Sequence, residues 1–558
     1  MTKNVDEAQS LPALLLGLAV ADPVRAMFTY WRDESWRTMR RGDFAQAVAD
    51  AAAGLRGQGV MPGDRVLLVS ENRPEFLIAD TAIMAIGAVT VPTYVANTVA
   101  DHAHILRDSG ARVAIASTPA LAARLREVGE LDLLICLDGP AEDALPWADL
   151  ARPGADAAML IAEAEQIPEG RLACLIYTSG TGGSPKGVML PHRALLSNCR
   201  AIHLLLRQMR LPQAGRYLSF LPLSHSYEHT VGGFTMPSFG LETVFSRGAD
   251  KLMADFAEHR PQLVTAVPRL FEVLRERIEG QLAKDRQLKQ VLFRQAVALG
   301  LREMDGPPLS WLERVQDRLL DRLVRSKVRA RFGGELAALV SGGARLDPDL
   351  SGFFLALGVP IIQGYGQTEA GPVISVNLPW DNDRRSVGRP LPGVEARIAE
   401  DGELLVRGPL MMDGYWNNPE ATAMAIQDGW LHTGDVAELR EGRLHITDRK
   451  RDFLKLKGGD MVAPAKIEAL LAGEPAIAQA VVGGEGLAGV VALIIAAEGR
   501  SGEVDAAVKR VNGRLSAIER IRRHAALSEP FTVENGLLTP TMKVKRRLVL
   551  DRYREMLT

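Results

Sequence analysis

Ten consecutive residues, Thr178 to Gly187, carry side chains suited to binding phosphate. The apolar run Ala173–Tyr177 leads into the stretch TSGTGGSPKG, which combines hydroxyls, four glycines and one lysine. Backbone N–H groups, hydroxyl donors and one ammonium can together surround phosphate oxygens. Lys186 lies between Pro185 and Gly187, so this is not a Walker A loop, in which Ser or Thr follows the lysine. A flexible turn of small residues is the alternative, and the fixed order of hydroxyls, glycines and lysine argues against it.

A second chemical segment, Gly364 to Glu369, has the sequence GYGQTE and follows the apolar run Val359–Ile362. In an α/β sheet, ligands bind in the crevice at the carboxyl ends of the strands, where this segment is expected. Upstream, the glycines of Ser341–Ala344 allow a ligand to approach the backbone closely, although alone this would be an ordinary turn.

Four further segments contain candidate binding groups that are weak evidence by themselves. Asp435 follows glycine in the stretch WLHTGD, and such an Asp is usually a turn residue. The segments 448–459 and 538–547 are rich in Lys and Arg, which would ordinarily be solvated surface. His225 follows an apolar run, and a single His there is more often structural than functional. The order of these segments along the chain therefore carries more weight than any one of them.

The elements that must position these groups show the rhythm of strands and helices in an α/β fold. A helical stretch at Pro74–Ile86 lies among apolar runs at Arg65–Ser70, Ala88–Pro92 and Ala111–Ala116. The same rhythm returns at Gln262–Val267, Leu336–Ser341 and Val359–Gln363. This alternation predicts a large, mostly parallel sheet with flanking helices.

Three later regions of the chain have a different pattern of apolar and charged residues. From Phe271 to Arg331 the pattern is charged and helix-periodic with a break at Gly306–Pro308, which predicts a helical hairpin. After Pro390, short β-like segments predict a β-rich subdomain. A small unit follows, in which residues 449–558 contain 19 Lys and Arg against 13 Asp and Glu. We therefore expect an α/β protein with a large N-terminal domain, residues 1–448, and a small α+β C-terminal domain, residues 449–558.

Composition excludes several classes of protein. The 558 residues exceed one ordinary domain, and 47% apolar with 24% charged residues is average for globular proteins. A formal charge of −2 predicts no global field that would recruit nucleic acid or an anionic membrane, so any site for a polyanion must be local. Three cysteines without CxxC spacing indicate neither a disulfide framework nor a zinc site, and they fit a reducing cytoplasm. We expect no signal peptide or transmembrane segment; peripheral contact with the inner face of the membrane and a homodimer stay open.

Taken in order, the segments resemble the motifs of the adenylate-forming (AMP-binding) superfamily. TSGTGGSPKGV is similar to the family stretch TSGTTGxPKG, with Gly182 in place of the second Thr and therefore one hydroxyl donor fewer. GYGQTE resembles GYGxTE, and the stretch around Asp435 resembles the TGD element. The segments 448–459 and 538–547 resemble the inter-domain segment and the terminal lysine motif. The resemblance covers nearly the whole chain.

This resemblance implies ATP, Mg²⁺ and CoA as ligands, and it implies roles for residues that match the motifs. Catalytic roles fall on Lys543, Thr368, Glu369, Lys186 and His225. Glu369 would hold Mg²⁺, His225 would border the carboxylate of the substrate, and Lys545 is the rival of Lys543. A mobile C-terminal domain would rotate about the hinge at Arg451, where relatives commonly have Asp or Lys.

Nucleotide and CoA contacts are implied for a larger set of residues. The phosphate loop would contribute Thr178, Ser179, Gly180, Thr181, Gly182 and Gly183. Adenine and ribose would contact Gly343, Ala344, Gly364, Tyr365, Gly366, Asp435 and Arg449. After domain rotation, CoA would pass Lys457, Gly458 and Gly459.

Four features resemble the long-chain fatty acyl-CoA synthetases within the superfamily: Leu221–Glu228, Val267–Phe271, the helical insertion 272–331 and the ending PTMKVKR. The activity implied is ATP-dependent ligation of a fatty acid to CoA through an acyl-AMP intermediate, with release of AMP and pyrophosphate. Two alternatives remain, namely transfer of the adenylated acid to a carrier protein and a non-catalytic acyl- or nucleotide-binding relative.

Overall fold

The computed structural model describes residues 5–129, 131–178, 185–212, 214–450, 454–458, 460–539 and 544–557, with only the backbone of residues 448, 449 and 461. Eight of the predicted site and hinge residues therefore lie outside the described residues, as does the side chain of Arg449: Ser179, Gly180, Thr181, Gly182, Gly183, Arg451, Gly459 and Lys543.

The first large sheet carries the phosphate-loop segment. Its strand order is β19-β9-β8-β4-β3-β5-β6-β7. The bounds are β3 Arg65–Val69, β4 Val89–Thr93, β5 Val113–Ala116, β6 Leu133–Cys136, β7 Leu145–Pro146, β8 Leu172–Thr178, β9 Lys186–Pro191 and β19 Gly414–Tyr415. Strands β3 to β6 pair in parallel, as the apolar runs predicted, and β9 runs antiparallel to β8.

A second sheet carries the GYGQTE segment. Its order is β16-β15-β14-β13-β12-β10-β11-β1-β2. The bounds are β1 Ala26–Arg32, β2 Ser35–Arg40, β10 Arg216–Ser219, β11 Glu242–Phe245, β12 Leu263–Ala266, β13 Ala338–Ser341, β14 Ile361–Gly366, β15 Val373–Val376 and β16 Arg389–Pro390. Strands β10 to β14 pair in parallel, so their carboxyl ends lie along one edge.

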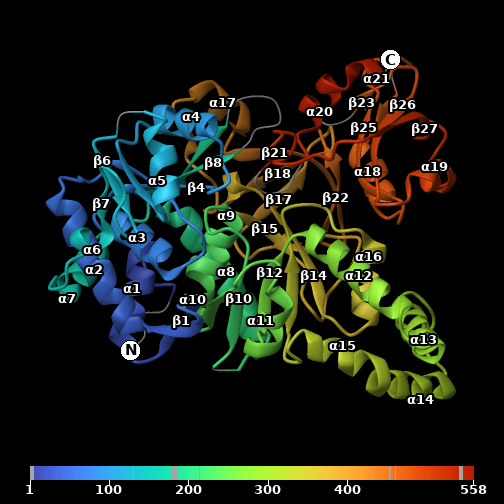
Figure 1. The fold of residues 1–558 in the computed structure, drawn as a ribbon, viewed down its shortest axis with the longest axis horizontal. Helices are drawn as coiled ribbons and strands as arrows, with labels where there is room; N and C mark the ends of the chain where they lie inside the picture. The colour runs from blue at the N-terminus through green and yellow to red at the C-terminus, as the bar shows by residue number, and fades with distance from the viewer. Residues whose placement is uncertain are drawn as a thin grey trace.

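Helices cover both sheets, and Figure 1 shows the blue and green helices flanking the strands of the N-terminal half. The helices before residue 210 are α1 Leu11–Ala21, α2 Arg41–Gly57, α3 Pro74–Ala85, α4 Val99–Ser109, α5 Pro119–Arg126, α6 Trp147–Leu150, α7 Ala157–Ala164 and α8 His192–Gln208. Those that follow include α9 Ser226–Glu228, the π-helical turn η1 His229–Thr235, α10 Met236–Phe239, α11 Leu252–His259, α16 Pro348–Ala356 and α17 Pro419–Ala425.

The helical region after residue 267 differs from the predicted hairpin. It forms α12 Pro268–Ala283, α13 Gln287–Asp305, α14 Trp311–Leu320, the π-helical turn η2 Asp321–Arg325 and α15 Ser326–Arg331. The break at Gly306–Pro308 is confirmed, but a second break at 284–286 makes three successive helical segments instead of two. Residues Lys284, Asp285 and Arg286 are exposed and offer no apolar side chain to bury, so the helix ends there.

A third sheet, predicted as the β-rich subdomain, has the order β17-β18-β21-β20, and β22 pairs with β21. Its bounds are β17 Glu395–Ile398, β18 Glu403–Arg407, β20 Ile426–Gln427, β21 Trp430–Arg440 and β22 Arg443–Arg449. Its pairings are antiparallel, and β21 carries the predicted ribose-binding Asp435.

The residues after 453 build a separate small core. The elements are β23 Leu454–Lys455, β24 Met461–Val462, α18 Pro464–Ala472, β25 Ile477–Gly483, β26 Val490–Ala496, α19 Val504–Gly513, β27 Ile521–Leu527, α20 Arg546–Arg552 and α21 Arg554–Leu557. Two apolar clusters draw all their described members from residues 454–557, which gives this α+β unit its own core. The unit appears in orange and red beside β22 in Figure 1.

Membrane-spanning segments were a separate expectation. Among the described residues, every helix is too short or too polar to cross a bilayer.

Candidate functional site

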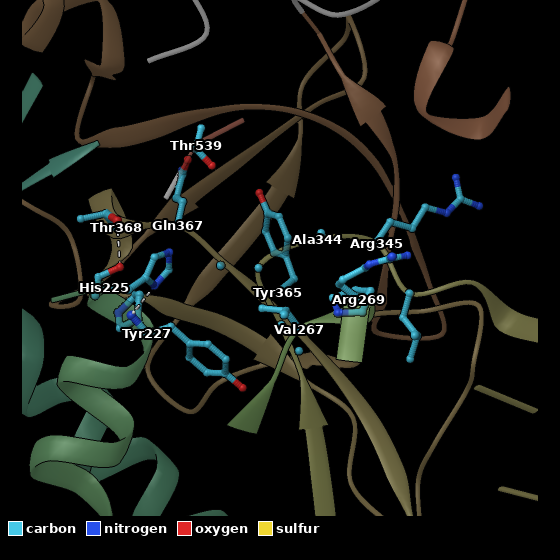
Figure 2. A pocket seen from close by; sticks show the side chains of 18 of the residues that line it. His225, Tyr227, Val267, Arg269, Ala344, Arg345, Tyr365, Gln367, Thr368 and Thr539 are labelled. Atoms are coloured by element: carbon cyan, nitrogen blue, oxygen red, sulfur yellow. Dashed lines mark hydrogen bonds between the residues drawn. The ribbon is translucent and has the colours of Figure 1, made fainter. Parts of the chain in front are cut away.

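A continuous cleft of about 3220 Å³ lies where the three sheets meet the C-terminal unit. It is lined by most of the described residues that the motifs singled out, namely Thr178, Lys186, His225, Gly343, Ala344, Gly364, Tyr365, Gly366, Thr368, Glu369 and Asp435. These residues come from positions separated by more than 250 residues, and the strand order brings them together. Figure 2 shows His225, Thr368, Tyr365 and Ala344 around the same cavity.

Thr178 and Lys186 hold the two ends of the phosphate-loop segment. Thr178 is the last residue of β8 and Lys186 the first of β9, and they are direct cross-strand partners. Both line the cleft, so the loop between them begins and ends at the cavity wall. The Nζ atom of Lys186 lies 4.9 Å from the ring centroid of Tyr415, within cation–π range.

Glu369 follows β14 in a short 3-10 turn, and its carboxylate is oriented by Tyr415. The Tyr415 hydroxyl donates a 2.8 Å hydrogen bond to Oε1 of Glu369. Tyr415 belongs to β19, which pairs with β9, so this one ring contacts both the predicted cation and the predicted metal ligand. Tyr415 was not predicted from the sequence, because a two-residue strand has no periodicity to reveal it.

Thr368 joins the GYGQTE segment to the segment around His225. The hydroxyls of Thr368 and Ser226 lie 2.8 Å apart, and Thr368 is 8% exposed. His225 caps helix α9, where its Nδ1 accepts the backbone N–H of Tyr227 at 3.2 Å. A neutral His225 ring therefore carries its proton on Nε2. Figure 2 shows the His225 ring beside this hydroxyl pair.

Tyr365 and Asp435 meet across two sheets. The Tyr365 hydroxyl donates a 2.5 Å hydrogen bond to Oδ2 of Asp435, which is largely buried in β21. Asp435 is also the cross-strand partner of Arg449 in β22, as expected for two residues predicted to contact one ribose. The carboxylate that was ambiguous in sequence is therefore held at the cleft and does not merely close a turn.

The SGGA segment follows β13 and borders Tyr227. A Cβ atom on Gly342 would lie 2.9 Å from the Tyr227 ring, so a larger residue would displace that ring. The Tyr227 hydroxyl donates to the carbonyl of Val340 at 3.2 Å. Glycine at this position thus keeps the wall of the cavity flat, as the sequence suggested for a close approach of backbone.

Behind the cleft wall, Glu228 forms a buried carboxyl site that the sequence analysis gave no role. Ser219, Tyr217 and Thr265 each donate a hydroxyl hydrogen bond to its oxygens, at 2.6 to 2.9 Å. Burial raises the pKa of Glu228 to about 7, and the hydroxyl donors act against that rise. A Cβ atom on Gly232 would clash with the carboxylate, so the GG pair of η1 leaves space for this acid.

The lining of the cleft also includes a set of apolar side chains, here called the apolar group. Its members are Ile202, Leu205, Leu206, Met209, Val231, Met236, Leu263, Ala338 and Ile362. Several of these side chains belong to one apolar cluster between α8 and the second sheet. A surface of this kind suits an aliphatic chain better than a polar ligand.

The site residues predicted in the C-terminal unit are placed differently. Lys457 and Gly458 are not among the residues that line the cleft, and the backbone N–H of Lys457 donates a hydrogen bond to the carbonyl of Leu487 within its own unit. Lys545, the rival of Lys543, does line the cleft. The structure thus brings together the described site residues predicted in the N-terminal domain and leaves Lys457 and Gly458 apart from them.

Comparisons with known proteins agree with this site. Residues 19–416 match the family model described as AMP-binding enzyme. The chain is 35% identical to the long-chain-fatty-acid–CoA ligase FadD15 of Mycobacterium tuberculosis, over 99% of this chain and 96% of that protein. It is 30% identical to the peroxisomal long chain acyl-CoA synthetase 7 of Arabidopsis thaliana, over 92% of this chain and 79% of that one.

A solved structure shares the fold at lower identity. The o-succinylbenzoate CoA synthetase of Bacillus subtilis, in complex with ATP and magnesium ion, aligns with a TM-score of 0.72 at 22% identity, over 96% of this chain and 98% of that chain. The family model covers most of this chain and includes the phosphate-loop, GYGQTE and Tyr415 segments. The chain therefore belongs to the AMP-binding enzyme family.

Proposed function

We propose that this protein ligates a long-chain fatty acid to CoA, using ATP and forming an acyl-AMP intermediate. The observation that carries the proposal is that one cleft is lined both by Lys186, Glu369 and Asp435 and by the apolar group. The first three residues suit a nucleotide, and the apolar group suits an acyl chain. The 35% identity to a long-chain-fatty-acid–CoA ligase over nearly the whole chain supports the same assignment.

In the first half-reaction, a carboxylate oxygen of the acid attacks the α-phosphorus of ATP. The bond from that phosphorus to the bridging oxygen of pyrophosphate breaks, giving acyl-AMP and pyrophosphate. Two anions must meet, so donors and cations at the transferring phosphoryl group lower the barrier. Thr368 contacts the α-phosphate, Lys186 stabilises the pyrophosphate, and Lys543 supplies positive charge for the transferring phosphoryl group.

The donor set around Glu369 fits Mg²⁺. A carboxylate and the nearby Thr368 hydroxyl are hard oxygen donors, and Mg²⁺ is commonly bound by one or two carboxylates plus substrate phosphates. When bound, the ion neutralises charge on the phosphate oxygens of ATP. Tyr415 holds the Glu369 carboxylate in place, and Asp435 accepts hydrogen bonds from the ribose hydroxyls.

In the second half-reaction, the sulfur of CoA attacks the acyl carbonyl. The carbon–oxygen bond to the phosphate breaks, AMP leaves, and the thiol loses its proton. Residues 449–558 act as a domain that rotates about Arg451 and exchanges Lys543 for the segment around Lys457 and Gly458. The position of Lys457 and Gly458 outside the cleft lining supports two arrangements of this domain.

The test is an assay of the purified protein with ATP, Mg²⁺ and a panel of acids from acetate to oleate plus benzoate. Pyrophosphate release and acyl-CoA formation are recorded with and without CoA. We expect acyl-CoA formation to be greatest with the long-chain acids. Pyrophosphate release without thioester formation would indicate that the acyl group is transferred to a carrier protein and not to CoA. Inactivity on every acid would overturn the proposal.

A further inference from the structure

The outer surface of α14 and η2 carries an apolar stripe that the fold does not use. Trp311, Leu312, Val315, Leu319 and Leu323 are 71%, 61%, 57%, 55% and 41% exposed. The positions i, i+1, i+4, i+8 and i+12 fall on one face of a helix. The stripe is about 18 Å long at 1.5 Å per residue. In Figure 1, α14 lies at the lower right edge of the molecule, away from the N-terminus.

Packing of the helix does not require this stripe. The opposite side of the same segment buries Leu320 and Val324 in the cluster that holds the helical region against the second sheet. An ordinary surface helix would place polar residues on its outer side. A contiguous exposed row of one Trp and four aliphatic side chains instead marks a surface that binds something apolar.

Charges beside the stripe are arranged asymmetrically. The acidic residues of the segment are occupied by ion pairs, namely Glu313 with Arg302, Asp317 with Arg325, and Asp321 with Arg329. Arg314, Arg318 and Arg322 are exposed at four-residue spacing along one edge of the stripe. Within the described part of the chain, Arg318 and Arg322 have no acidic partner within ion-pair distance. The stripe is therefore bordered by uncompensated positive charge.

We propose that α14 and η2 dock this protein on a lipid bilayer that carries anionic headgroups. Leu312, Val315 and Leu319 insert into the boundary between headgroups and acyl chains, and Trp311 anchors the end of the stripe there. Arg318 and Arg322 pair with headgroup phosphates, which are negatively charged and lie at the same depth as the stripe edge. The helix lies along the membrane surface and does not cross it.

A second copy of this chain is a poorer occupant of the same face. In a symmetric pair the same arginine row would border the seam from both copies, and the acidic residues of each segment are already held in ion pairs. Anionic headgroups supply the negative charge that such a dimer lacks. Charge complementarity thus favours the bilayer.

Vesicle flotation of the full-length protein without ATP tests the proposal independently of its enzymatic activity. Vesicles of phosphatidylcholine alone are compared with vesicles that also contain phosphatidylglycerol, at low and high salt. We expect binding to the mixed vesicles, with L312E/L319E reducing the bound-to-free ratio by about tenfold or more. The matched control is Met159→Glu on α7, because Met159 is 60% exposed whereas the adjacent Leu160 and Ile161 of that helix are not exposed.

A second variant separates the electrostatic contribution to vesicle binding from the contribution of the apolar side chains. R318E/R322E should reduce binding to the mixed vesicles by about tenfold and abolish its salt dependence, with little change on phosphatidylcholine alone. Thermal unfolding should be unchanged in both variants, since the replaced side chains are exposed. Failure of the wild-type protein to float, or equal effects of Met159→Glu, would overturn the proposal. Loss of a wild-type dimer in L312E/L319E, without vesicle binding, would assign the face to a second copy.

Discussion

The N-terminal cleft wall and the C-terminal unit contribute to the same cavity in different ways. In the wall, candidate ligand contacts are tied to one another across elements: Tyr365 to Asp435, Glu369 to Tyr415, and Thr368 to Ser226. In the C-terminal unit, the ion pairs of Arg546 with Glu468 and of Lys466 with Glu519 remain inside the unit. The wall is thus pre-organised, whereas the unit is held together independently of the wall.

This difference indicates how one cleft can serve two reactions. A site whose donors are fixed in advance loses little free energy on binding ATP. A separate unit with its own core can change position without unfolding either part. The predictions below would break or sharpen this contrast between a fixed wall and a replaceable unit.

The largest effect is expected from Lys543→Ala. Loss of one transition-state donor should slow adenylation by a factor of about 10² to 10³. Thioester formation from preformed acyl-AMP should be largely intact, because in the proposed domain rotation that step uses the other arrangement of the unit. Single-turnover measurements of the two half-reactions check this, with Lys545→Ala as the rival variant. Equal loss in both steps would contradict domain rotation.

The next effect concerns the stability of the protein, which should depend on pH through the buried Glu228 behind the wall. Burial raises the pKa of Glu228 to about 7 from its ordinary value of 4.5, so the folded state binds the proton more tightly than the unfolded chain. Its stabilising contribution is therefore complete below pH 4.5 and is lost as the pH rises through 7. Compared with Glu228→Gln, the wild-type free energy of unfolding should fall by up to about 3 kcal/mol over this interval.

Urea denaturation at a series of pH values measures this difference. Glu276→Gln, at an exposed position of α12, is the control and should follow the wild type throughout. If the free energies of unfolding of Glu228→Gln and the wild type differed by the same amount at every pH, Glu228 would already be ionised in the folded protein. The carboxyl would then not act as a neutral, buried anchor behind the wall.

A smaller effect is expected at Tyr415. Tyr415→Phe removes the hydrogen bond to Glu369 and keeps the ring near Lys186, which should lower kcat/KM for ATP by about threefold. Tyr415→Ala removes both contacts and should lower it by about tenfold. Pyrophosphate release at varied ATP concentration is the measurement, with Tyr30→Phe on β1 as control. If both variants had an unchanged kcat/KM, Tyr415 would not contribute to the pre-organisation of the wall.

The smallest effect tests the contact between the two regions. Arg514 of the unit lies 3.5 Å from Asp349 of α16, and both side chains are exposed. Such a pair is worth less than about 1 kcal/mol, so Arg514→Ala should leave both half-reactions within twofold of the wild type. Steady-state rates and half-reaction rates measure this. A large loss in one half-reaction alone would show that this pair selects one arrangement of the unit.

Much of the fold followed from local pattern. The apolar runs Arg65–Ser70, Ala111–Ala116 and Leu336–Ser341 predicted parallel strands. The structure has strands within them, at Arg65–Val69, Val113–Ala116 and Ala338–Ser341. The helical hairpin was wrong because the break at Lys284 contains no Gly or Pro to signal it. Charged residues are compatible with a helix, so only the absence of something to pack against ends α12.

The sequence by itself determined the chemistry available to this protein: the order of the motifs, the residue types in them, and their places at strand ends. Tertiary structure alone decided that Tyr415 contacts Lys186 and Glu369, that Glu228 is enclosed by three hydroxyls, and that the stripe of α14 stays exposed. The physical reason is the separation along the chain between the residues that interact. Periodicity reports which face of one element is apolar, whereas contacts between residues more than a hundred positions apart depend on strand order and on how the helices pack.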